Sequence, residues 1–478
     1  TNPKKINNMN ISKTLSAFAT SAMLLFSVTS CDKDDDNNID EPIPSTDLDA
    51  YKPQNEAAVS KAMIAAKVNP FKDAYYYDVM QYLWSKEYKD FTKKVSKFSN
   101  NAAAAIGANS QGNTAVSPLS VFMALSMAAE SANGDTRQEI LDAMGITYEE
   151  LAANIKYLCY TCNQVLDYGE SNSNGKNRIK SINSLWVQNG VQVKDAGVNS
   201  LTSNYFADLF NMDFEGSDVN EIIKSYISNE TNGLLSPDLE LNADTYLVLM
   251  NVVYLRDIWN KYGNDLPLTD KTYDFVNYDR STLSTKLLQG YYHSGKAVET
   301  EKFRKFYNTT NSGLSMTFFV PKDGYTLDDI YTSDVLNDPT PYVTIDVTSD
   351  PEVNYRFHTR CFFPEFEASF DDDIKDVIHK MGVNKFFTRG GCDFSNLTDE
   401  GVFCSQIRHI TKLEVSRKGI EGAAVTVEYM DTNADPGPGH EEKRWEDVYY
   451  DFPVDRNFAY VLSKDGVPIF TGVVKNIK

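Results

Sequence analysis

Two cysteines stand at the spacing that redox and metal sites use. Cys159 and Cys162 form a C-x-x-C pair, whose thiolates would serve a thiol–disulfide reaction or a zinc ion. The pair lies in a helical-looking run, residues 151–166, without a second ligand pair or a βαβ context. The five cysteines beyond Cys31 are odd in number and scattered, so a complete disulfide framework is impossible, although isolated pairs stay open. We interpret Cys159 and Cys162 as buried thiols and expect no metal and no cofactor.

The sequence has no other pattern that indicates an enzyme. It has five histidines and contains no H-E-x-x-H, G-x-S-x-G or P-loop motif, and its carboxylates show no spacing that singles out an acid/base pair. A surface hydrolase acting on glycans is the disfavoured alternative. The net charge is −21 without a Lys/Arg block, which argues against a nucleic-acid partner because phosphate binding needs clustered cations.

The N-terminal 31 residues predict a lipoprotein signal peptide. A basic start precedes a short apolar run, residues 15–28, which is too short to span a bilayer. Residues 28–31 then resemble a bacterial lipobox, in which the thiol of Cys31 is acylated before signal cleavage. The acidic residues 32–36 resemble the tag of surface-exported lipoproteins in Bacteroidetes, with an ordinary solvated linker as the alternative. We expect an outer-membrane lipoprotein, exposed at the cell surface, whose only membrane contact is a lipid on Cys31.

Three segments follow the predicted signal peptide. Residues 32–50 are acidic and contain prolines, which predicts a tether. Residues 51–88 are rich in Tyr and Ala with helical periodicity, and we interpret them as an N-terminal helical extension. Residues 89–478 are numerous enough to form one large domain with a sizeable core, since 42% of the chain is hydrophobic.

The long C-terminal segment mixes helix and strand signals. Ser117 and Pro118 predict a helix start, because the hydroxyl caps the helix and proline suits its first position. Residues 136–139, Thr-Arg-Gln-Glu, predict a capping box that opens a second helix ending at Gly145. Strands are predicted at residues 246–255, 314–321 and 355–364 and in a hairpin over 458–474. We expect an α+β domain with large antiparallel sheets.

Several separated segments, taken in order, resemble the serpin family of serine protease inhibitors. They are residues 114–121 and 134–145, residues 249–259, residues 405–409 with 419–424, and residues 455–472. The resemblance covers residues 89–478. It implies a serpin fold with a large central antiparallel sheet, two further sheets, about eight to nine helices and an exposed reactive loop between Gly419 and Phe452.

The function that the resemblance implies is suicide inhibition of serine endopeptidases, with cysteine endopeptidases as a second class. The central sheet of a serpin is one strand short, and the cleaved loop inserts into it while the protease is trapped as a covalent acyl-enzyme. The partner is the target protease, and we expect a monomer. The sheet must open locally, so it needs a polar lock, here named the shutter network. By resemblance the network comprises Ser117, Ser120, Asn251 and His409, and Trp259 lies near the point where insertion begins.

The hinge of the expected loop must be small and uncharged on its inward side. By resemblance it comprises Gly419, Ile420, Glu421, Gly422, Ala423, Ala424, Val425 and Thr426. Because side chains alternate along a strand, the inward positions are Ile420, Gly422, Ala424, Thr426 and Glu428, and the first four satisfy the requirement. The family usually has an acidic residue where Arg417 stands and Thr or Ser where Ile420 stands. We interpret both departures as weakening inhibition by degree.

The attacked bond is expected at Asn433-Ala434 from the family's spacing. The loop is about a dozen residues longer than the family norm, with the excess around residues 436–444. Further candidates for the attacked residue are Tyr429, Met430, Lys443 and Arg444. Lys443 and Arg444 would attract a trypsin-like protease, but cleavage there leaves a longer segment, at roughly 3.3 Å per residue, and we expect unproductive turnover. The alternative function is a non-inhibitory serpin-fold surface lipoprotein that acts as a binding or structural module.

Overall fold

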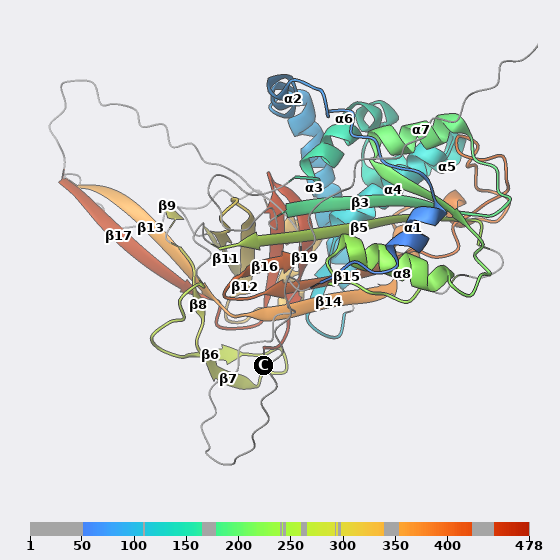
Figure 1. Ribbon diagram of the computed structural model, residues 1–478. Coiled ribbons are helices and arrows are strands. Elements are labelled where there is room, and N and C mark those ends of the chain that lie inside the picture. The colour runs from blue at the N-terminus through green and yellow to red at the C-terminus, as the bar shows by residue number, and fades with distance from the viewer. Residues whose placement is uncertain are drawn as a thin grey trace, which may run out of the picture. The chain divides into compact units, whose positions relative to one another are not determined.

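A seven-stranded sheet forms the centre of the part of the chain that the structure describes. The computed structural model describes residues 51–108, 110–164, 178–239, 241, 245–259, 265–291, 293–294, 298–338, 353–422 and 444–477, all within the unit Ile43–Lys478. The strands of the sheet, in spatial order, are β1 (Met63–Ala65), β4 (Ala207–Met212), β3 (Arg178–Gln188), β5 (Leu247–Ile258), β16 (Gly419–Gly422), β15 (Arg408–Val415) and β14 (Phe366–Asp373) (Figure 1). All neighbours are antiparallel except β3 and β4, so the sheet is mostly, not wholly, antiparallel.

Strand β5 confirms the strand predicted at residues 246–255. Its apolar run is nearly continuous because both faces of the sheet are covered. Val253 and Leu255 belong to one buried cluster with the helices behind the sheet, whereas Val252 and Tyr254 belong to another with α8 (Val219–Glu230). The alternation therefore assigns each side chain of β5 to one of two apolar layers.

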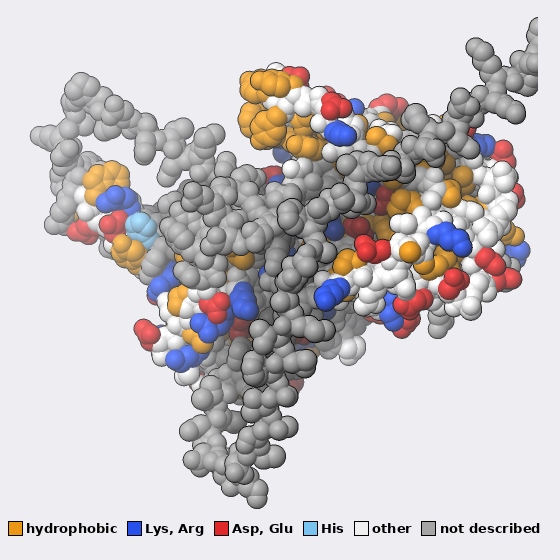
Figure 2. Space-filling view, viewed as in Figure 1, with side chains coloured by type: hydrophobic (Ala, Val, Ile, Leu, Met, Phe, Trp, Pro, Cys, Tyr) orange, Lys and Arg blue, Asp and Glu red, His pale blue; other side chains and the backbone are white. Residues whose placement is uncertain are grey.

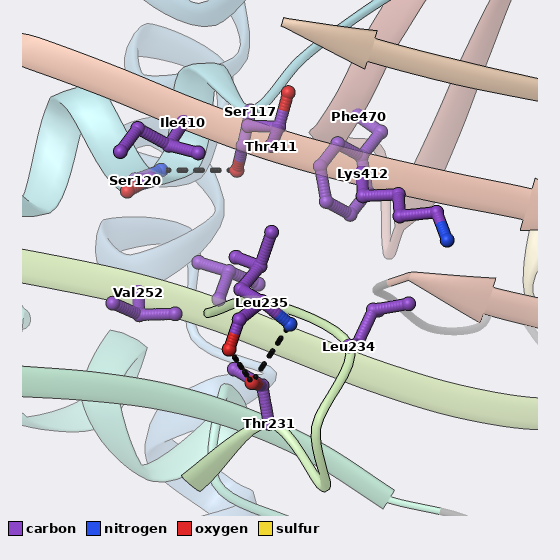
Figure 3. Close-up of a pocket in the computed structure, with 11 residues that line it drawn as sticks. Ser117, Ser120, Thr231, Leu234, Leu235, Val252, Ile410, Thr411, Lys412 and Phe470 are labelled. Carbon is purple, nitrogen blue, oxygen red and sulfur yellow. Dashed lines mark hydrogen bonds between the residues drawn. The ribbon is translucent and has the colours of Figure 1, made fainter. Parts of the chain in front are cut away.

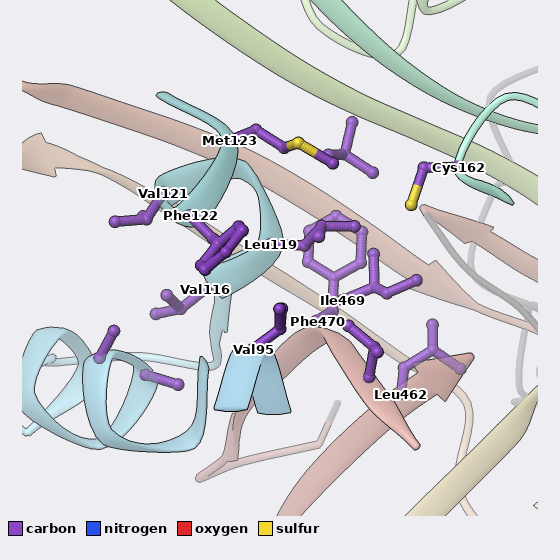
Figure 4. Close-up of a cluster of buried hydrophobic side chains, with 14 of the residues drawn as sticks. Val95, Val116, Leu119, Val121, Phe122, Met123, Cys162, Leu462, Ile469 and Phe470 are labelled. Carbon is purple, nitrogen blue, oxygen red and sulfur yellow. The ribbon is translucent and has the colours of Figure 1, made fainter. Parts of the chain in front are cut away.

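A six-stranded sheet packs behind the central one. Its strands, in order, are β10 (Val298–Glu299), β11 (Phe303–Thr309), β12 (Ser315–Pro321), β18 (Phe458–Lys464), β19 (Val467–Val474) and β2 (Thr114–Val116). The predicted C-terminal hairpin is confirmed by the pairing of β18 with β19. Phe470 and Ile469 of this hairpin pack against Leu119 and Phe122 in the main core (Figure 4).

The remaining strands form two small sheets. They are β17 (Arg444–Pro453), β13 (Val353–Phe363), β8 (Leu288–Gln289) and β9 (His293–Ser294) in one sheet, and β6 (Tyr273–Val276) with β7 (Thr282–Thr285) in the other. Strands β13 and β17 run in parallel as a long two-stranded ribbon (Figure 1). The described residues thus form four sheets, one more than expected.

Eleven α-helices lie among the described residues. They are α1 (Glu56–Ala62), α2 (Tyr76–Leu83), α3 (Lys86–Gly107), α4 (Pro118–Ser131), α5 (Gly134–Met144), α6 (Tyr148–Thr161), α7 (Asp195–Asn204), α8, α9 (Leu327–Ile330), α10 (Ser333–Leu336) and α11 (Lys375–Lys380), with a 3-10 turn at Lys385–Phe387. Without α1 and α2 of the N-terminal extension, nine helices remain among the described residues, which agrees with the expected eight to nine. No helix in this part of the chain is both long and apolar enough to cross a membrane.

Helix α4 begins as predicted, but α5 begins two residues earlier than its predicted capping box. Ser117 caps α4 and Pro118 is its first residue. The cap of α5 is Asn133, whose side chain accepts from the Gly134 amide. The hydroxyl of Thr136 accepts instead from the amide of Asp393, and Glu139 accepts from Asn384 and Lys385. These side chains make tertiary contacts, which a local motif cannot reveal.

The N-terminal extension holds a strand besides its helices. Strand β1 joins the edge of the central sheet by pairing with β4, and α1 packs on α8. Helix α2 and the two residues that flank it carry a group of exposed aromatic side chains, which Figure 2 shows as an apolar area over that helix: Tyr75, Tyr76, Tyr77 and Trp84. The helical periodicity of residues 51–88 did not indicate the strand, because three residues are too few to show an alternating pattern.

Candidate functional site

The residues of the predicted shutter network meet where α4 begins behind the central sheet. The Ser117 amide donates to His409 Nε2 at 3.0 Å, and the Ser120 hydroxyl donates to the carbonyl of Asn251 at 2.9 Å. The Asn251 amide group donates in turn to Asn183 Oδ1 on β3 at 2.7 Å. Four elements that are distant in the sequence are therefore joined by hydrogen bonds at one level of the sheet.

His409 is buried and held as a neutral acceptor. Its side chain lies within the sheet at β15, and burial lowers the pKa of the imidazole to about 4. The Ser117 amide requires an acceptor at Nε2, so the neutral form fits this contact. The neighbouring Asn251 Oδ1 accepts no hydrogen bond from any described residue although it is buried. Asn251 therefore presents an unused acceptor on the core side of β5.

A gap separates β5 from β15 below the short strand β16. In the described residues no ladder joins β5 to β15 directly, and β16 pairs with each of them only at one end. A small pocket, with room for about one water molecule, lies in this gap (Figure 3). Its lining includes Val252 and Val253 of β5, Ile410 and Lys412 of β15, and Leu235 from the turn after α8. Below β16, strands β5 and β15 are thus not joined by a ladder, and side chains fill most of the space between them.

Trp259 holds the turn that leads into β16. Its indole Nε1–H donates to the carbonyl of Ser416 at 2.6 Å, and its backbone amide donates to the carbonyl of Lys418 at 3.3 Å. The ring is fully buried and packs edge-on against Phe363, with centroids 5.3 Å apart. These contacts fix the position at which the chain reverses from β15 into β16.

Strand β16 contains the first four residues of the predicted hinge. A Cβ atom on Gly419 would lie 2.1 Å from the carbonyl oxygen of Asp257, so only glycine fits there. Ile420 is 1% exposed and belongs to the main core, and Glu421 accepts from the hydroxyl of Tyr254 at 3.0 Å on the opposite face. Ile420 points inward, as the alternation predicted, and it is already seated in the sheet.

Asp257 is a buried carboxylate that the sequence analysis missed. It lies directly opposite Ile420 in the register between β5 and β16. Hydroxyls of Thr310 and Ser312 donate to it at 2.5 and 3.0 Å, yet burial outweighs them and raises its pKa to about 6. The only sequence signal was an acidic residue inside an apolar strand, and its hydroxyl partners lie more than 50 residues away.

Arg417 has acidic and carbonyl partners around it. Its backbone amide donates to Glu365 Oε1 at 2.6 Å, its Nε donates to the Leu266 carbonyl at 3.2 Å, and Asp265 lies 3.9 Å from Nε. Burial raises the pKa of Glu365, which the Arg417 contacts partly offset. The basic residue in place of the family's acidic one therefore stands opposite acidic neighbours.

After the expected reactive loop, the chain continues into β17, which forms a ribbon with β13. Arg444 begins β17 and pairs with Val353 in the ladder. Farther along, Arg360 contacts Asp451 through two nitrogens, at 3.0 and 3.1 Å. His358 stacks on Tyr449, with ring centroids 4.8 Å apart. Arg444, the last residue of the predicted excess, therefore belongs to a paired strand, and residues 436–443 lie outside the described residues.

The other predicted site residues lie outside the described residues. They are Cys31, Ala423, Ala424, Val425, Thr426, Tyr429, Met430, Asn433, Ala434 and Lys443. Cys159, Cys162 and Cys361 are buried, and burial raises the pKa of the Cys162 thiol to about 12. No group of ligating side chains that could hold a metal ion occurs among the described residues.

The comparisons with known proteins agree on one family. The family described as "Serpin (serine protease inhibitor)" matches residues 93–477. Mouse neuroserpin is 24% identical over 389 residues, which cover 77% of this chain and 87% of that protein. Among solved structures, Serpin48 of the insect Tenebrio molitor has a TM-score of 0.64 at 19% identity and covers 82% of this chain and 99% of its own. Human thyroxine-binding globulin, in complex with thyroxine, has a TM-score of 0.61 at 17% identity and covers 82% and 99%.

Proposed function

Because the chain belongs to the serpin family, we propose that it is a suicide inhibitor of serine endopeptidases, with cysteine endopeptidases as a second class of target. It acts as a monomer on its target protease, with no catalytic residue and no cofactor of its own. The observation that carries the proposal is β16, a four-residue strand seated between β5 and β15, which no ladder joins beyond it among the described residues. A strand that has begun to fill a gap can be lengthened by the residues that follow it.

The two registers of β16 define where those residues would go. Continued along β5 and β15, they bring Thr426 between Asn251 and His409 on the core side. The buried Asn251 Oδ1 there has no donor among the described residues, and a threonine hydroxyl supplies one. Insertion would therefore replace the separated strands by a continuous ladder and satisfy an unpaired acceptor at the same time.

The chemistry begins on the protease. Its serine or cysteine nucleophile attacks the carbonyl carbon of the bait residue, an ester or thioester bond forms, and the peptide C–N bond breaks. The leaving amine takes the proton that the base of the protease removed from the nucleophile. The residues before the cut, still bonded to the protease, then insert into the gap and carry the protease with them before water can hydrolyse the acyl bond.

The bait residue is proposed within Tyr429–Ala434. Arg444 is the weaker candidate because its backbone is paired with Val353 in the ladder of β17 and β13. A protease holds its substrate as an extended segment in its own active site, which a paired strand cannot provide without leaving its ladder. A trypsin-like enzyme that cuts at Lys443 or Arg444 is expected to release a cleaved product.

The test is incubation with trypsin-, elastase-, subtilisin- and papain-like proteases. We expect an SDS-stable complex with at least one of them, and mass spectrometry should find the acyl bond within Tyr429–Ala434. An acyl bond at Arg444 would overturn the assignment of the bait, and the absence of any covalent complex together with complete loop cleavage would overturn inhibition.

The second candidate function is a non-inhibitory binding module. The seated Ile420 favours it, because a loop that is already anchored in the sheet has less freedom to reach a protease active site. Thyroxine-binding globulin, a serpin structure in complex with thyroxine, illustrates a family member with a bound small molecule. Loop cleavage separates the two functions: an inhibitor gains a large amount of thermal stability after cleavage, and a rigid scaffold does not.

The cellular location is proposed from the N-terminal sequence alone. Cys31 carries a lipid that holds the protein at the outer membrane, and residues 32–50 tether the inhibitor at the cell surface. Labelling with a radioactive fatty acid should modify the protein and fail in Cys31→Ala. Digestion of intact cells with an external protease should remove the surface-exposed domain, and full protection would place it on the inner side of the membrane.

A further inference from the structure

Helix α8 and the turn after it cover the path that an inserting strand would take. Ile223 and Tyr226 of α8 pack on Trp186 and Tyr254 of the central sheet. The turn contributes Leu234 and Leu235 to the pocket between β5 and β15 (Figure 3). Both elements lie on the face opposite the main core.

An inserting strand needs the space under this turn. Continuing the registers of β16, Val425 would lie between Val252 and Ile410 with its side chain facing outward. Val252 and Ile410 line the pocket together with Leu234 and Leu235. The turn must therefore move away from the sheet before Val425 can enter, and α8 is continuous with it.

Residues 51–68, here named the brace, hold the end of α8 that leads into this turn. Tyr51 Oη lies 2.7 Å from Asn229 Oδ1 and 2.9 Å from Ser228 Oγ. Asn229 exchanges two further hydrogen bonds with the backbone of Gln54, at 2.7 and 2.8 Å. The Tyr51 ring also covers Gly233, where a Cβ atom would lie 2.6 Å from it.

The other end of the brace is fixed to the sheet edge. Strand β1 pairs with β4, and the Lys67 amide donates to the buried Asp208 at 2.9 Å. Between the two ends, Val59 and Ala62 of α1 are buried in the cluster that α8 shares with the sheet. The brace therefore spans from an edge strand, which insertion leaves in place, to the helix that insertion must displace.

A chain of hydrogen bonds connects the braced turn to the hinge. The side-chain amide of Asn232 donates to Tyr254 Oη at 3.0 Å, and the Tyr254 hydroxyl donates to Glu421 at 3.0 Å. Asn232 has a φ of 51°, in the left-handed region that asparagine tolerates in turns. Movement of the turn thus breaks a contact that holds β16 in its present position.

We propose that the brace sets the rate at which a strand inserts into the central sheet. This inference rests on the proposed function, since it takes insertion as the event that is controlled. The contacts of Tyr51 and Asn55 with α8 exist in the present state and must break or stretch when the turn moves. They stabilise the starting state over the transition state, so their loss accelerates insertion.

The test uses the full chain and a synthetic peptide with the sequence of residues 419–432. The peptide reports on strand insertion without a protease. We expect Tyr51→Ala combined with Asn55→Ala to take up the peptide about tenfold faster than the parent protein, which corresponds to about 1.4 kcal/mol of lost starting-state stabilisation. Lys52→Ala, an exposed position of the same segment, is the matched control and should leave the rate unchanged.

The outcomes separate the brace from the proposed function. Tyr51→Phe keeps the aromatic ring over Gly233 and removes only the hydroxyl contacts, so it can be tested even if the double variant folds poorly. We expect it to accelerate peptide insertion about threefold, less than the double variant. Equal rates in the parent, Tyr51→Phe and folded double variant would overturn the brace. Failure of the peptide to anneal to any of these proteins would instead overturn insertion itself.

Discussion

The two ends of the segment 423–443 are held in different ways. At the first end, β16 has four residues, lies between two strands, and seats Ile420 in the core with 1% exposure. At the second end, β17 has ten residues, pairs with β13 on one side, and exposes Trp445 and Tyr449. The first end is a short strand that further residues could lengthen between β5 and β15. The second end is a long strand that is paired with β13 over its whole length.

This difference assigns the ends different roles in the proposed inhibition. Growth of β16 fills a gap in the described part of the sheet, whereas β17 keeps its ladder with β13 whether or not the bait is cut. A cut before Arg444 then leaves the second end attached to the body. Changes at the first end should therefore affect function, and changes at the second end should affect local stability only.

The largest expected effect is a charge on the inward side of the inserting strand. Thr426→Lys would place an ammonium group between Asn251 and His409, and burying an unpaired charge costs several kcal/mol. We expect the variant to be cut as a substrate, with no SDS-stable complex. Thr426→Ser, which keeps an uncharged hydroxyl at the same position, is the control and should retain inhibition. Inhibition by Thr426→Lys would contradict the register that β16 defines.

The next effect concerns pH, because one buried ionisable group, Asp257, lies opposite β16 and a second, His409, lies farther along β15. His409 has a folded pKa of about 4 against an ordinary 6.5, so its stabilising contribution is present above pH 6.5 and is lost as the pH falls to about 4. Asp257 has a folded pKa of about 6 against 3.8, so its contribution is present below pH 3.8 and is lost as the pH rises through 6. Between pH 4 and 6 the two slopes oppose each other.

Asp257→Asn should therefore leave the destabilisation caused by protonation of His409 at low pH without the opposing contribution of Asp257. Relative to the parent, the free energy of unfolding of the variant should fall more steeply below pH 6, by roughly 1.4 kcal/mol per pH unit. Urea unfolding of both proteins from pH 7 to 4 measures this slope. His409→Gln should change the slope in the opposite direction, and parallel curves for parent and Asp257→Asn would refute the assignment.

A smaller and more local effect is expected from Ile420→Ala. Removing a buried isoleucine side chain costs about 2–5 kcal/mol, but a four-residue strand can detach by itself and limit the loss. Hydrogen exchange should show the protection of the β16 amides reduced by roughly 30-fold or more, while β17 keeps its protection. Val448→Ala in β17 is the counterpart, and it should leave the β16 amides unaffected.

The smallest effect is expected from Arg360→Ala in the ribbon. Its two contacts with Asp451 are well aligned, but the side chains are 22% and 42% exposed, so solvent screens the pair. We expect a loss of unfolding free energy of about 1 kcal/mol or less and no change in inhibition. A lost covalent complex would mean that the second end takes part in trapping.

The sequence predicted the framework of the site better than its contacts. The strand at β5, the cap at Ser117 and the inward direction of Ile420 follow from short-range patterns, which local chain geometry enforces. The start of α5 was wrong because Thr136 and Glu139 bind residues about 250 positions away. The hydroxyl partners of Asp257 and the acidic neighbour Glu365 of Arg417 were not predicted either, because they too are distant in the sequence.

By itself, the sequence determined the alternation through the hinge, the order of helices and strands, and the resemblance that identified the family. The tertiary structure alone decided that Ile420 is already seated, that β17 is paired through Arg444, and that residues 51–68 brace α8. Periodicity is a property of neighbouring residues and can be read along a chain. A contact such as that of Tyr51 with Asn229, 178 positions apart, exists only because the sheet and helix between them bring the two residues together.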